Sequence, residues 1–307
     1  MSADWKFEVR HQALEIRACV LHAIRAFFLS RDYLEVETPN RIPAPLPESH
    51  IDAVPAGEWS LHPSPELCMK RMLASGYERI FQISKCYREH ERGPLHLPEF
   101  SLLEWYHVGY DYIRLMDQCE DLFLYVSEAL GKGNPIQYRN REIDLLKPWE
   151  RLSVKESFER YGSVAMEKAL LENRFEEILA LEIEPRLGIP KPTFLCDYPL
   201  AFGSLARARK DNPTVAERFE IYIGGLELAN GFSELTDADE QRNRFRKEND
   251  TRVKRGRSHY PMPEKFLDAV SHMPESAGIA LGVDRLVMLF ADAVSIDEVV
   301  SFTPEEL

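Results

Sequence analysis

Apolar residues recur at the three-to-four-residue spacing of a helix face in two stretches of the chain. The first covers residues 14–28, and the second covers residues 115–130 and is followed by Gly131. Helices commonly end at a glycine, and the first stretch gives way to polar residues at 31–32. A third helix is expected after Ser64, Pro65 and Glu66, which supply an N-cap, a first-turn proline and a first-turn acid.

Strand patterns lie between these helices. Alternating or β-rich stretches cover residues 34–39, 79–87, 100–106, 218–223 and 226–229. The second and third are joined by a long charged loop, and the last two flank Gly224 and Gly225, the signature of a tight two-residue hairpin. We therefore expect two antiparallel hairpins, one in each half of the chain.

The order of elements predicts the fold class. Hairpins separated by helices, rather than strict strand-helix alternation, indicate an α+β fold with an antiparallel sheet flanked by helices. Residues 135–215 have a less readable pattern that suggests several helices. No internal repeat, low-complexity stretch or Pro/Ser-rich linker divides the chain, so residues 1–307 are expected to form a single domain.

Composition narrows the function classes. The chain has 307 residues, with 38 Lys and Arg against 51 Asp and Glu, and its net charge of −13 excludes a broadly cationic nucleic-acid coat protein. No stretch approaches the roughly 20 apolar residues of a membrane span, so no membrane association is expected. Five widely separated cysteines without a CxxC pair argue against a zinc cage or a disulfide framework and favour a reducing, cytoplasmic location.

Two acids of the second hairpin form a candidate metal site. With a two-residue turn, Tyr222 pairs with Glu227 and Glu220 pairs with Ala229, which places Glu220 and Glu227 on one face about 7–8 Å apart. Two carboxylates at that spacing can hold Mg²⁺ together with phosphates and water. A solvated acidic face is an alternative of equal weight.

A third acid and two arginines extend the candidate site. Alternation places Glu104 on the same strand face as large apolar residues, where a carboxylate needs a cation from the chain or from a ligand. Arg88 follows a strand, and Arg285 lies in the first turn of a helix after Gly282, where a cation is disfavoured unless an anion such as phosphate binds beside it. No GxxxxGK[ST] or GxGxxG loop is present.

Four segments together resemble the catalytic domain of the class II lysyl-tRNA synthetases, over about residues 12–304. Residues 34–39 resemble motif 1, which forms the dimer interface of that class, and residues 88–106 resemble motif 2. Residues 278–286 (GIALGVDRL) resemble motif 3, and residues 227–238 (ELANGFSELTDA) are the most specific match. The resemblance implies a class II aminoacyl-tRNA synthetase catalytic domain that forms a homodimer.

The chain is more similar still to the truncated paralogues that join lysine or (R)-β-lysine to a lysine side chain of translation elongation factor P. Synthetases carry an anticodon-binding barrel before motif 1, whereas only about thirty residues precede that motif here. The paralogues share the segment from Ser64 to Glu66, the sequence LEWY at 103–106, and Ala280, where synthetases usually have glycine. This resemblance implies a protein without an anticodon-binding domain that uses ATP and Mg²⁺, takes elongation factor P as acceptor and needs no tRNA.

The family pattern also implies a role for each matching residue. ATP would be bound by Arg88, Glu89, His90, Leu97, Phe100, Glu227, Leu228, Gly282 and Arg285. The amino-acid substrate would be bound by Ser64, Pro65, Glu66, Glu104, Tyr106, Asn230, Phe232, Glu234 and Ala280. Mg²⁺ would be held by Glu220 and Glu227. Arg88 and Arg285 would be catalytic, because they clamp the α- and γ-phosphates. Glu104, Tyr106 and Glu234 would receive the ammonium end of the substrate, and Ser64 and Glu66 its backbone amine.

Two positions depart from the family pattern. His90 stands where the family has a glutamate that contacts adenine, and Leu97 stands where it has an asparagine. A neutral histidine can accept a hydrogen bond, and Glu89 or Glu91 could supply a carboxylate if the loop shifts, but leucine cannot replace an amide. One lost hydrogen bond costs about 0.5–1.5 kcal/mol, so weaker ATP binding is expected rather than its loss.

Two other function classes compete with this interpretation. One is a ligase that transfers to a small-molecule acceptor, as asparagine synthetase transfers to ammonia; Glu104 and Glu234 argue against a pocket for an acidic substrate. The other is a non-catalytic synthetase paralogue, which His90 and Leu97 would favour and the retained arginines disfavour.

A basic segment offers a candidate docking surface for elongation factor P. Residues 242–257 contain eight Lys and Arg residues and two acids in an otherwise acidic chain. Such a segment can steer an acidic partner, although a solvated basic helix is the commoner explanation.

Overall fold

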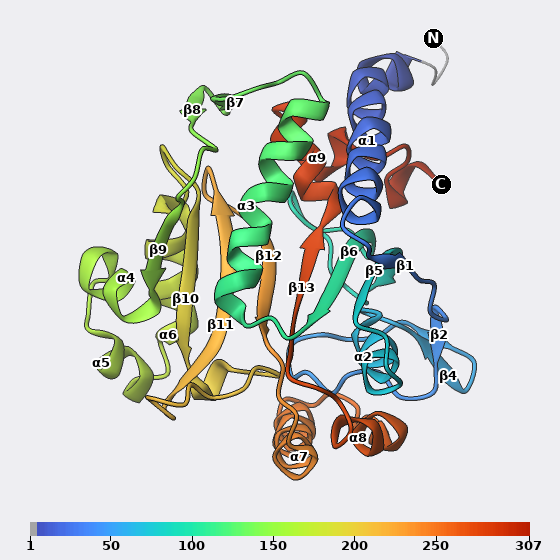
Figure 1. The fold of residues 1–307 in the computed structure, drawn as a ribbon, viewed down its shortest axis with the longest axis vertical. Coiled ribbons are helices and arrows are strands. Elements are labelled where there is room, and N and C mark those ends of the chain that lie inside the picture. The colour runs from blue at the N-terminus through green and yellow to red at the C-terminus, as the bar shows by residue number, and fades with distance from the viewer. Residues whose placement is uncertain (1–4) are drawn as a thin grey trace.

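The computed structural model describes residues 5–307, and Figure 1 shows their arrangement. The helices are α1 (Trp5–Leu29), α2 (Glu66–Ala74), α3 (Tyr112–Ala129), α4 (Val154–Tyr161), α5 (Met166–Leu171), α6 (Phe175–Ile178), α7 (Ala238–Lys254), α8 (Glu264–Val270) and α9 (Val283–Ala291), with short turns η1 (Leu179–Ile183), η2 (Glu184–Arg186), η3 (Leu200–Phe202), η4 (Ile296–Glu298) and η5 (Pro304–Glu306). The strands are β1 (Leu34–Glu35), β2 (Arg41–Ile42), β3 (Pro55–Ala56), β4 (Trp59–Leu61), β5 (Arg79–Tyr87), β6 (Glu99–Val108), β7 (Ile136–Tyr138), β8 (Arg141–Ile143), β9 (Glu150–Ser153), β10 (Thr193–Pro199), β11 (Val215–Ile223), β12 (Leu226–Ser233) and β13 (Ser276–Gly282).

A large sheet in the order β1-β5-β6-β13-β12-β11-β10-β9 organises the molecule. The six central strands pair antiparallel in the order β5, β6, β13, β12, β11 and β10, which confirms the α+β class and both predicted hairpins. At each edge one strand pairs in parallel, β1 with β5 and β9 with β10. These parallel pairs were not predicted from the sequence.

Helices α1, α3 and α9 pack on one side of this sheet (Figure 1). The alternation along β6 explains the division between the two sides. Leu103 and Trp105 face the helices, where the indole N–H of Trp105 donates to Gln118 of α3 and its ring packs on Phe28 of α1. The intervening residues of β6, including Glu104, face the opposite side. That side is the one that carries the polar site.

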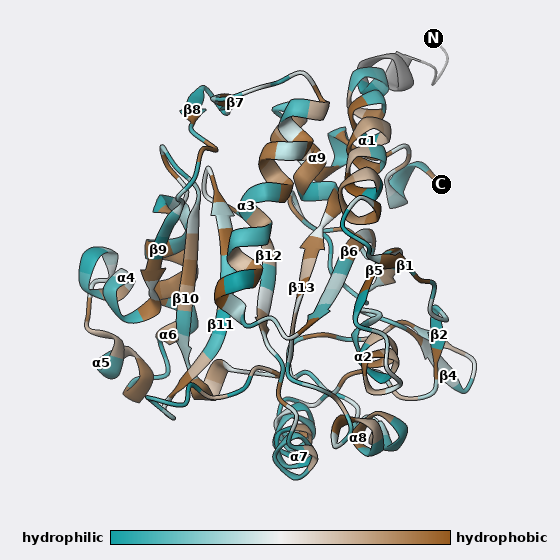
Figure 2. Ribbon diagram, viewed as in Figure 1, coloured by the Kyte–Doolittle hydropathy of each residue, from teal (hydrophilic) through white to brown (hydrophobic). Residues whose placement is uncertain are grey.

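Two further groups of elements pack around the large sheet with apolar clusters of their own. The segment from β9 to η2 has its own apolar cluster around Phe158 and Ile178, and α7 and α8 pack together through Phe245 and Phe266. Figure 2 shows that α7 is largely hydrophilic along its length, in contrast to the apolar strand β13. None of the helices in residues 5–307 has the length and apolar composition that crossing a membrane requires.

The strand predicted over residues 34–39 is only partly present. Regular pairing covers Leu34–Glu35, and Val36 still donates its backbone N–H to Phe81. Beyond it the N–H of Thr38 bonds to the side chain of Gln82 instead of to a neighbouring strand. Pro39 then has no N–H to offer, so the strand ends.

The β11–β12 hairpin contains a β-bulge that the predicted register lacks. The two pairs next to the turn are as predicted, but Leu228 is an extra residue that shifts the pairing by one position. Glu220 therefore lies opposite Asn230, and the predicted pairing of Glu220 with Ala229 is wrong. Because a bulge reverses the alternation of side chains beyond it, Glu227 and Asn230 both reach the face that carries Glu220.

Candidate active site

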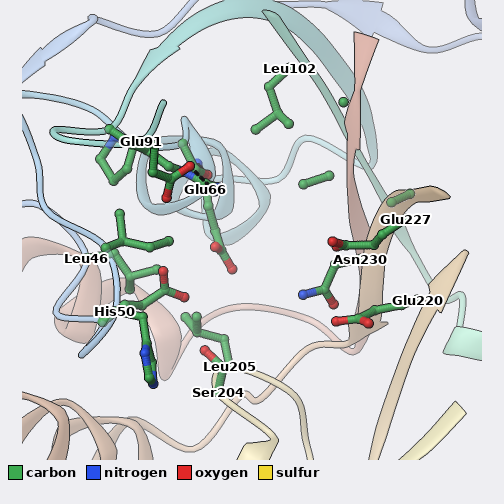
Figure 3. Close-up of a pocket in the computed structure, with 18 of the residues that line it drawn as sticks. Leu46, His50, Glu66, Glu91, Leu102, Ser204, Leu205, Glu220, Glu227 and Asn230 are labelled. Atoms are coloured by element: carbon green, nitrogen blue, oxygen red, sulfur yellow. Dashed lines mark hydrogen bonds and ion pairs between the residues drawn. The ribbon is translucent and has the colours of Figure 1, made fainter. Parts of the chain in front are cut away.

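A cavity of about 710 Å³ lies on the side of the sheet opposite α1 and α3. Its walls come from the β5–β6 hairpin, strands β11 to β13, the start of α2 and two loops around residues 46–51 and 201–205. Figure 3 shows Glu66, Glu220 and Glu227 pointing into the same space from different elements, with Asn230 beside the latter two. The topology therefore gathers acids from distant parts of the chain.

One row of side chains crosses four strands on the floor of this cavity. The row consists of Glu220 on β11, Asn230 on β12, Ala280 on β13 and Glu104 on β6, each paired with the next. Paired residues of antiparallel strands share a face. With neighbouring strands about 4.8 Å apart, the backbones of Glu104 and Glu220 lie about 14 Å apart, so the two acids mark opposite ends of the site.

Arg88 stands at one wall of the cavity, directly after β5. Its guanidinium lies over the ring of Phe100, 4.9 Å from the ring centroid, and Nη1 is 3.6 Å from a carboxylate oxygen of Glu91. The Nε atom of Arg88 is buried and has no hydrogen-bond acceptor within residues 5–307. A buried donor without an acceptor is costly, so this atom is available to an anionic ligand.

The loop after Arg88 turns at His90, whose φ of 66° lies in the left-handed region. The turn leaves the side chain of His90 81% exposed, whereas Glu91 lines the cavity. Neither Glu89 nor His90 contributes to the lining, so the nearest carboxylate to Arg88 from this loop is that of Glu91. Leu97 lines the cavity as an apolar, buried side chain.

Arg285, in the first turn of α9, is held by three residues beside the cavity, and its Nε donates to the backbone oxygen of one of them, Leu95, at 3.3 Å. Its Nη1 donates to the backbone oxygen of Glu227 at 2.8 Å and to Oε2 of Glu227 at 3.1 Å, and its Nη2 is 2.7 Å from Nε2 of His96. The pKa of His96 is lowered by burial and by the charge of Arg285, which favours the neutral ring as acceptor. Arg285 is thereby fixed with its guanidinium at the cavity wall.

Glu220 is the most strongly bound acid at this end. It accepts hydrogen bonds from the hydroxyls of Tyr198 and Tyr222, at 2.6 and 2.8 Å, and from Nη2 of Arg218 at 2.6 Å. Burial raises the pKa of Glu220 although Arg218 opposes the shift, and the charge of Glu227 raises it further. A cation between Glu220 and Glu227 would relieve that repulsion.

The donor set at this position fits Mg²⁺. Residues 5–307 contain no group of three or more His, Cys, Asp or Glu side chains that could enclose a metal ion. Mg²⁺ needs only one or two carboxylates when phosphates and water supply its other oxygen ligands. Glu220 and Glu227 both line the cavity and meet that requirement.

Glu104 marks the opposite end of the row and is 1% exposed. Oε1 accepts a hydrogen bond of 2.5 Å from the hydroxyl of Ser64, and Oε2 accepts one of 2.9 Å from the hydroxyl of Tyr106. Burial raises the pKa of Glu104 to about 8, and the negative charge of Glu66 adds to the shift. No ion pair neutralises Glu104 in the described structure, so its ionised form calls for a cationic ligand.

Lys70, which sequence reasoning missed, lies beneath this end of the cavity. Its Nζ is 2.6 Å from Oε1 of Glu66 and 2.5 Å from Oε2 of Glu234. Burial lowers the pKa of Lys70, but the two carboxylates outweigh burial and raise it overall. For the carboxyl of Glu234, burial has the opposite effect: it raises the pKa to about 8, although the charge of Lys70 opposes this rise.

The structure brings most of the predicted residues together around the cavity. Those that line it are Ser64, Glu66, Arg88, Leu97, Phe100, Glu104, Tyr106, Glu220, Glu227, Leu228, Asn230, Phe232, Ala280, Gly282 and Arg285. Those that do not line it are Pro65, Glu89, His90 and Glu234. Glu234 lies behind the wall beside Lys70, because Lys70 and Gly278 occupy the space around its carboxylate.

Arg218 and His96 are site residues that the sequence analysis also missed. Both line the cavity and hold predicted residues in place, Arg218 through Glu220 and Asn230 and His96 through Arg285. A charged residue at an inward position of β11, two residues before Glu220, was an available signal for Arg218. Nothing in the local sequence distinguished His96 from an exposed loop residue.

The basic segment of residues 242–257 is not a continuous docking surface. Arg252 is 1% exposed and binds the carboxylate of Asp52 at 2.7 Å together with the backbone oxygens of Glu48 and Ile51. Arg252 therefore fastens the cavity loop 46–51 to α7. Replacing Arg252 with an acid would disrupt the fold rather than a docking contact, because its buried guanidinium anchors this loop.

Comparison with known proteins places these observations in a family. A model described as tRNA synthetases class II (D, K and N) matches residues 2–306. The chain belongs to this family. Within it, the chain is 38% identical to the elongation factor P--(R)-beta-lysine ligase of Pectobacterium carotovorum subsp. carotovorum over 99% of the chain and 98% of that protein. Proteins of the same name from Erwinia tasmaniensis and Yersinia enterocolitica are 38% and 36% identical, each over 98% of both chains.

The family membership agrees with the geometry of the cavity and of the row of side chains on its floor. In this class II domain the antiparallel strands β6, β11, β12 and β13 carry the row of site residues, and α9 carries Arg285. The resemblance noted from motifs 1, 2 and 3 is confirmed at the level of the family and of the named relatives.

Proposed function

We propose that the protein is an ATP-dependent ligase that activates lysine or (R)-β-lysine as an adenylate and transfers it to a lysine side chain of elongation factor P. One observation carries the proposal. A single cavity has the acids Glu66 and Glu104 at one end and, at the other, arginines that can meet a carboxylate and phosphates, as a substrate with ammonium groups and a reactive carboxylate requires. The names of relatives that match nearly the whole chain supply the acceptor.

ATP is assigned to the end of the cavity that contains Arg88, Phe100 and Arg285. Phe100 offers a ring for the adenine to stack on, and the two arginines face the same space. Glu220 and Glu227 would hold Mg²⁺, which would neutralise charge on the phosphates when bound. Leu97 leaves the adenine one hydrogen bond short, which is consistent with modest rather than abolished ATP affinity.

The first step needs no general base. The substrate carboxylate is already ionised at neutral pH, and it attacks the α-phosphorus while pyrophosphate leaves. Arg88 supplies its free Nε donor to the anionic centre, and Arg285 holds the leaving phosphates. Glu104 and Glu66 fix the amino groups of the substrate, so its carboxylate is oriented toward Arg88.

In the second step the acceptor amine attacks the activated carbonyl, so that an amide bond forms while the bond to the phosphate breaks and AMP leaves. That amine is protonated at neutral pH and must lose a proton before it attacks. Glu48 lines the cavity, and burial raises the pKa of its carboxyl to about 7, while the charge of Arg88 opposes that shift. Glu48 is therefore the acid-base group that we assign to receive the proton.

The alternatives gain no specific support from the site. A non-catalytic paralogue would not need Arg88, Glu227 and Arg285 in one cavity, and a pocket for an acidic substrate would not be lined by Glu66 and Glu104. We further propose a cytoplasmic homodimer formed through the segment around β1, which analytical ultracentrifugation would test. A monomer at assay concentrations would contradict the dimer without affecting the proposed chemistry.

ATP–pyrophosphate exchange across a panel of amino acids, without tRNA, tests the proposed activity. We expect exchange with (R)-β-lysine or α-lysine and none with aspartate, asparagine or norleucine. Exchange driven best by an acidic amino acid would contradict the assignment of the amine end. No exchange with any amino acid would favour the non-catalytic alternative.

A further inference from the structure

Lys70 is buried beneath the amine end of the cavity and forms two close ion pairs. Its side chain is 1% exposed, and the side chain of Glu234 is 0% exposed. The ammonium bridges Glu66 and Glu234 at 2.6 and 2.5 Å, and it lies 4.8 Å from the ring centroid of Phe232. Because Lys70 is not among the residues that line the cavity, it acts on a bound molecule only through these acids.

The ionisable groups at the amine end contain more negative than positive charges, and the difference is called the charge deficit below. Three carboxylates, those of Glu66, Glu104 and Glu234, face one ammonium, that of Lys70. When all four groups are ionised, their sum is −2. Buried charges without partners are strongly unfavourable, so this end is complete only when a ligand brings two positive charges.

Other polar groups around these acids do not alter the sum. Ser64 and Tyr106 donate neutral hydrogen bonds to Glu104. Glu48 is a neighbouring acid: burial raises its pKa, the charges of Glu66 and Glu248 raise it further, and the charges of Arg88 and Arg218 lower it, so the acids Glu48 and Glu248 are offset by these two arginines. Burial raises the pKa values of both Glu104 and Glu234 to about 8. Protonation of these carboxyls therefore reduces the negative charge in the absence of a ligand.

We propose that Lys70 is a positioning residue that sets the charge of the amine end, so that it accepts a substrate with two ammonium groups. This inference rests on the proposed function, since lysine and (R)-β-lysine both carry two ammonium groups. It also predicts that a substrate with one ammonium group binds poorly. Such a substrate leaves one carboxylate unpaired or protonated, while the dication satisfies all three acids together with Lys70.

A double-variant comparison tests the charge count. Glu234→Gln alone lowers the deficit to −1 and should raise the KM for the diamino substrate by at least about thirtyfold in pyrophosphate exchange. Adding Lys70→Met returns the deficit to −2 without adding an acid. The double variant Lys70→Met/Glu234→Gln should therefore recover at least about tenfold of the loss in KM, with the KM for ATP unchanged.

Substrate choice gives a second readout that a purely structural role would not change. The ratio of kcat/KM for norleucine to that for lysine should rise in Glu234→Gln and fall again in the double variant. Lys70→Met alone removes a positive charge, so Glu104 and Glu234 should stay protonated up to a higher pH. The KM for the diamino substrate should then begin to fall only at a higher pH than in the wild type. Lys132→Met, a matched change at an exposed lysine, should leave KM, the ratio and the pH profile as in the wild type.

The outcomes separate the inference from the proposed function. Losses that multiply in the double variant, with all proteins folded by circular dichroism, would overturn the charge count. An inactive, folded double variant would do the same. A wild-type protein that activates no diamino acid would overturn the proposed function, and this inference would fall with it.

Discussion

Glu104 and Glu220 lie at the two ends of one row of side chains that crosses β6, β13, β12 and β11. The sheet spacing sets their backbones about 14 Å apart. This separation leaves room for an extended amino acid whose ammonium meets Glu104 and whose carboxylate reaches the phosphate end. A rigid sheet fixes the distance more accurately than loops would, which suits a reaction that depends on positioning.

Ala280 is the residue in that row next to Glu104. Its methyl group lines the cavity, so Ala280→Gly should open space near the backbone amine of the substrate. We expect a higher kcat/KM for α-lysine relative to (R)-β-lysine. The measurement is pyrophosphate exchange with both substrates, and an unchanged ratio would show that the methyl does not discriminate between them.

Gly278 lies where a side chain would displace site residues. A Cβ at this position would be 2.2 Å from the ring of Tyr106 and 2.7 Å from Oε1 of Glu234. Gly278→Ala should push Tyr106 away from Glu104, and such overpacking typically costs about 1–3 kcal/mol of unfolding free energy. We expect the KM for the amino acid to rise while the KM for ATP stays constant.

Gly93→Ala is the matched control, because a Cβ there meets nothing within 4 Å. It should leave both KM values and the unfolding free energy unchanged. Equal effects of the two substitutions would contradict the role assigned to the space beside Tyr106.

The buried carboxyl of Glu104 predicts how stability depends on pH. Its pKa is raised from an ordinary value of 4.5 to about 8, so the folded protein binds more protons than the unfolded chain between these values. The free energy of unfolding should therefore fall as the pH rises through this window. Urea unfolding of the ligand-free protein at several pH values should show this fall, and Glu104→Gln should reduce its slope. A slope unchanged in the variant would exclude Glu104 as its source.

Arg252 should contribute to stability rather than to docking. Removing one partner of a buried pair commonly costs about 3–5 kcal/mol, so Arg252→Met should lower the unfolding free energy by about this amount. It should also raise the KM for the amino acid, because the loop at Ile51 loses an anchor. Lys254→Met, on an exposed side chain of the same helix, should do neither. Thermal and urea unfolding of both variants would decide between the two roles.

Glu48 should act in the transfer step alone. Glu48→Gln should leave pyrophosphate exchange close to that of the wild type and slow transfer to the acceptor protein at least about tenfold at pH 7. We expect the wild-type transfer rate to fall below about pH 7, the pKa of this carboxyl, and the variant to lose that fall. Equal slowing of exchange and transfer would contradict a proton-accepting role. Glu176→Gln, a more exposed acid at the same cavity, is the matched control.

The sequence was sufficient for the elements whose pattern is local. The β5–β6 hairpin begins and ends close to the predicted residues, since its alternation is regular and no bulge interrupts it. The bulge at Leu228 could not be predicted, because an extra residue in a strand has no required sequence. Its consequence for the site was limited, since Glu220 and Glu227 still share one face.

Residues whose partners are distant in the sequence could not be assigned from it. Lys70 reads as one polar position of a short amphipathic helix, and only the fold brings Glu234 to it. In the sequence, Arg252 is similarly one of several basic residues of α7, and only the fold brings Asp52 beside it. The exposure of His90 depends on a left-handed turn at a non-glycine residue, which local preferences disfavour.

The most direct test of the proposed function is the intact mass of elongation factor P after incubation with the protein, ATP, Mg²⁺ and (R)-β-lysine or α-lysine. We predict that elongation factor P gains the mass of one lysyl or β-lysyl group on a single lysine, without tRNA, and that Arg88→Ala abolishes the gain. Unmodified elongation factor P, together with efficient aminoacylation of tRNA by the same protein, would contradict it.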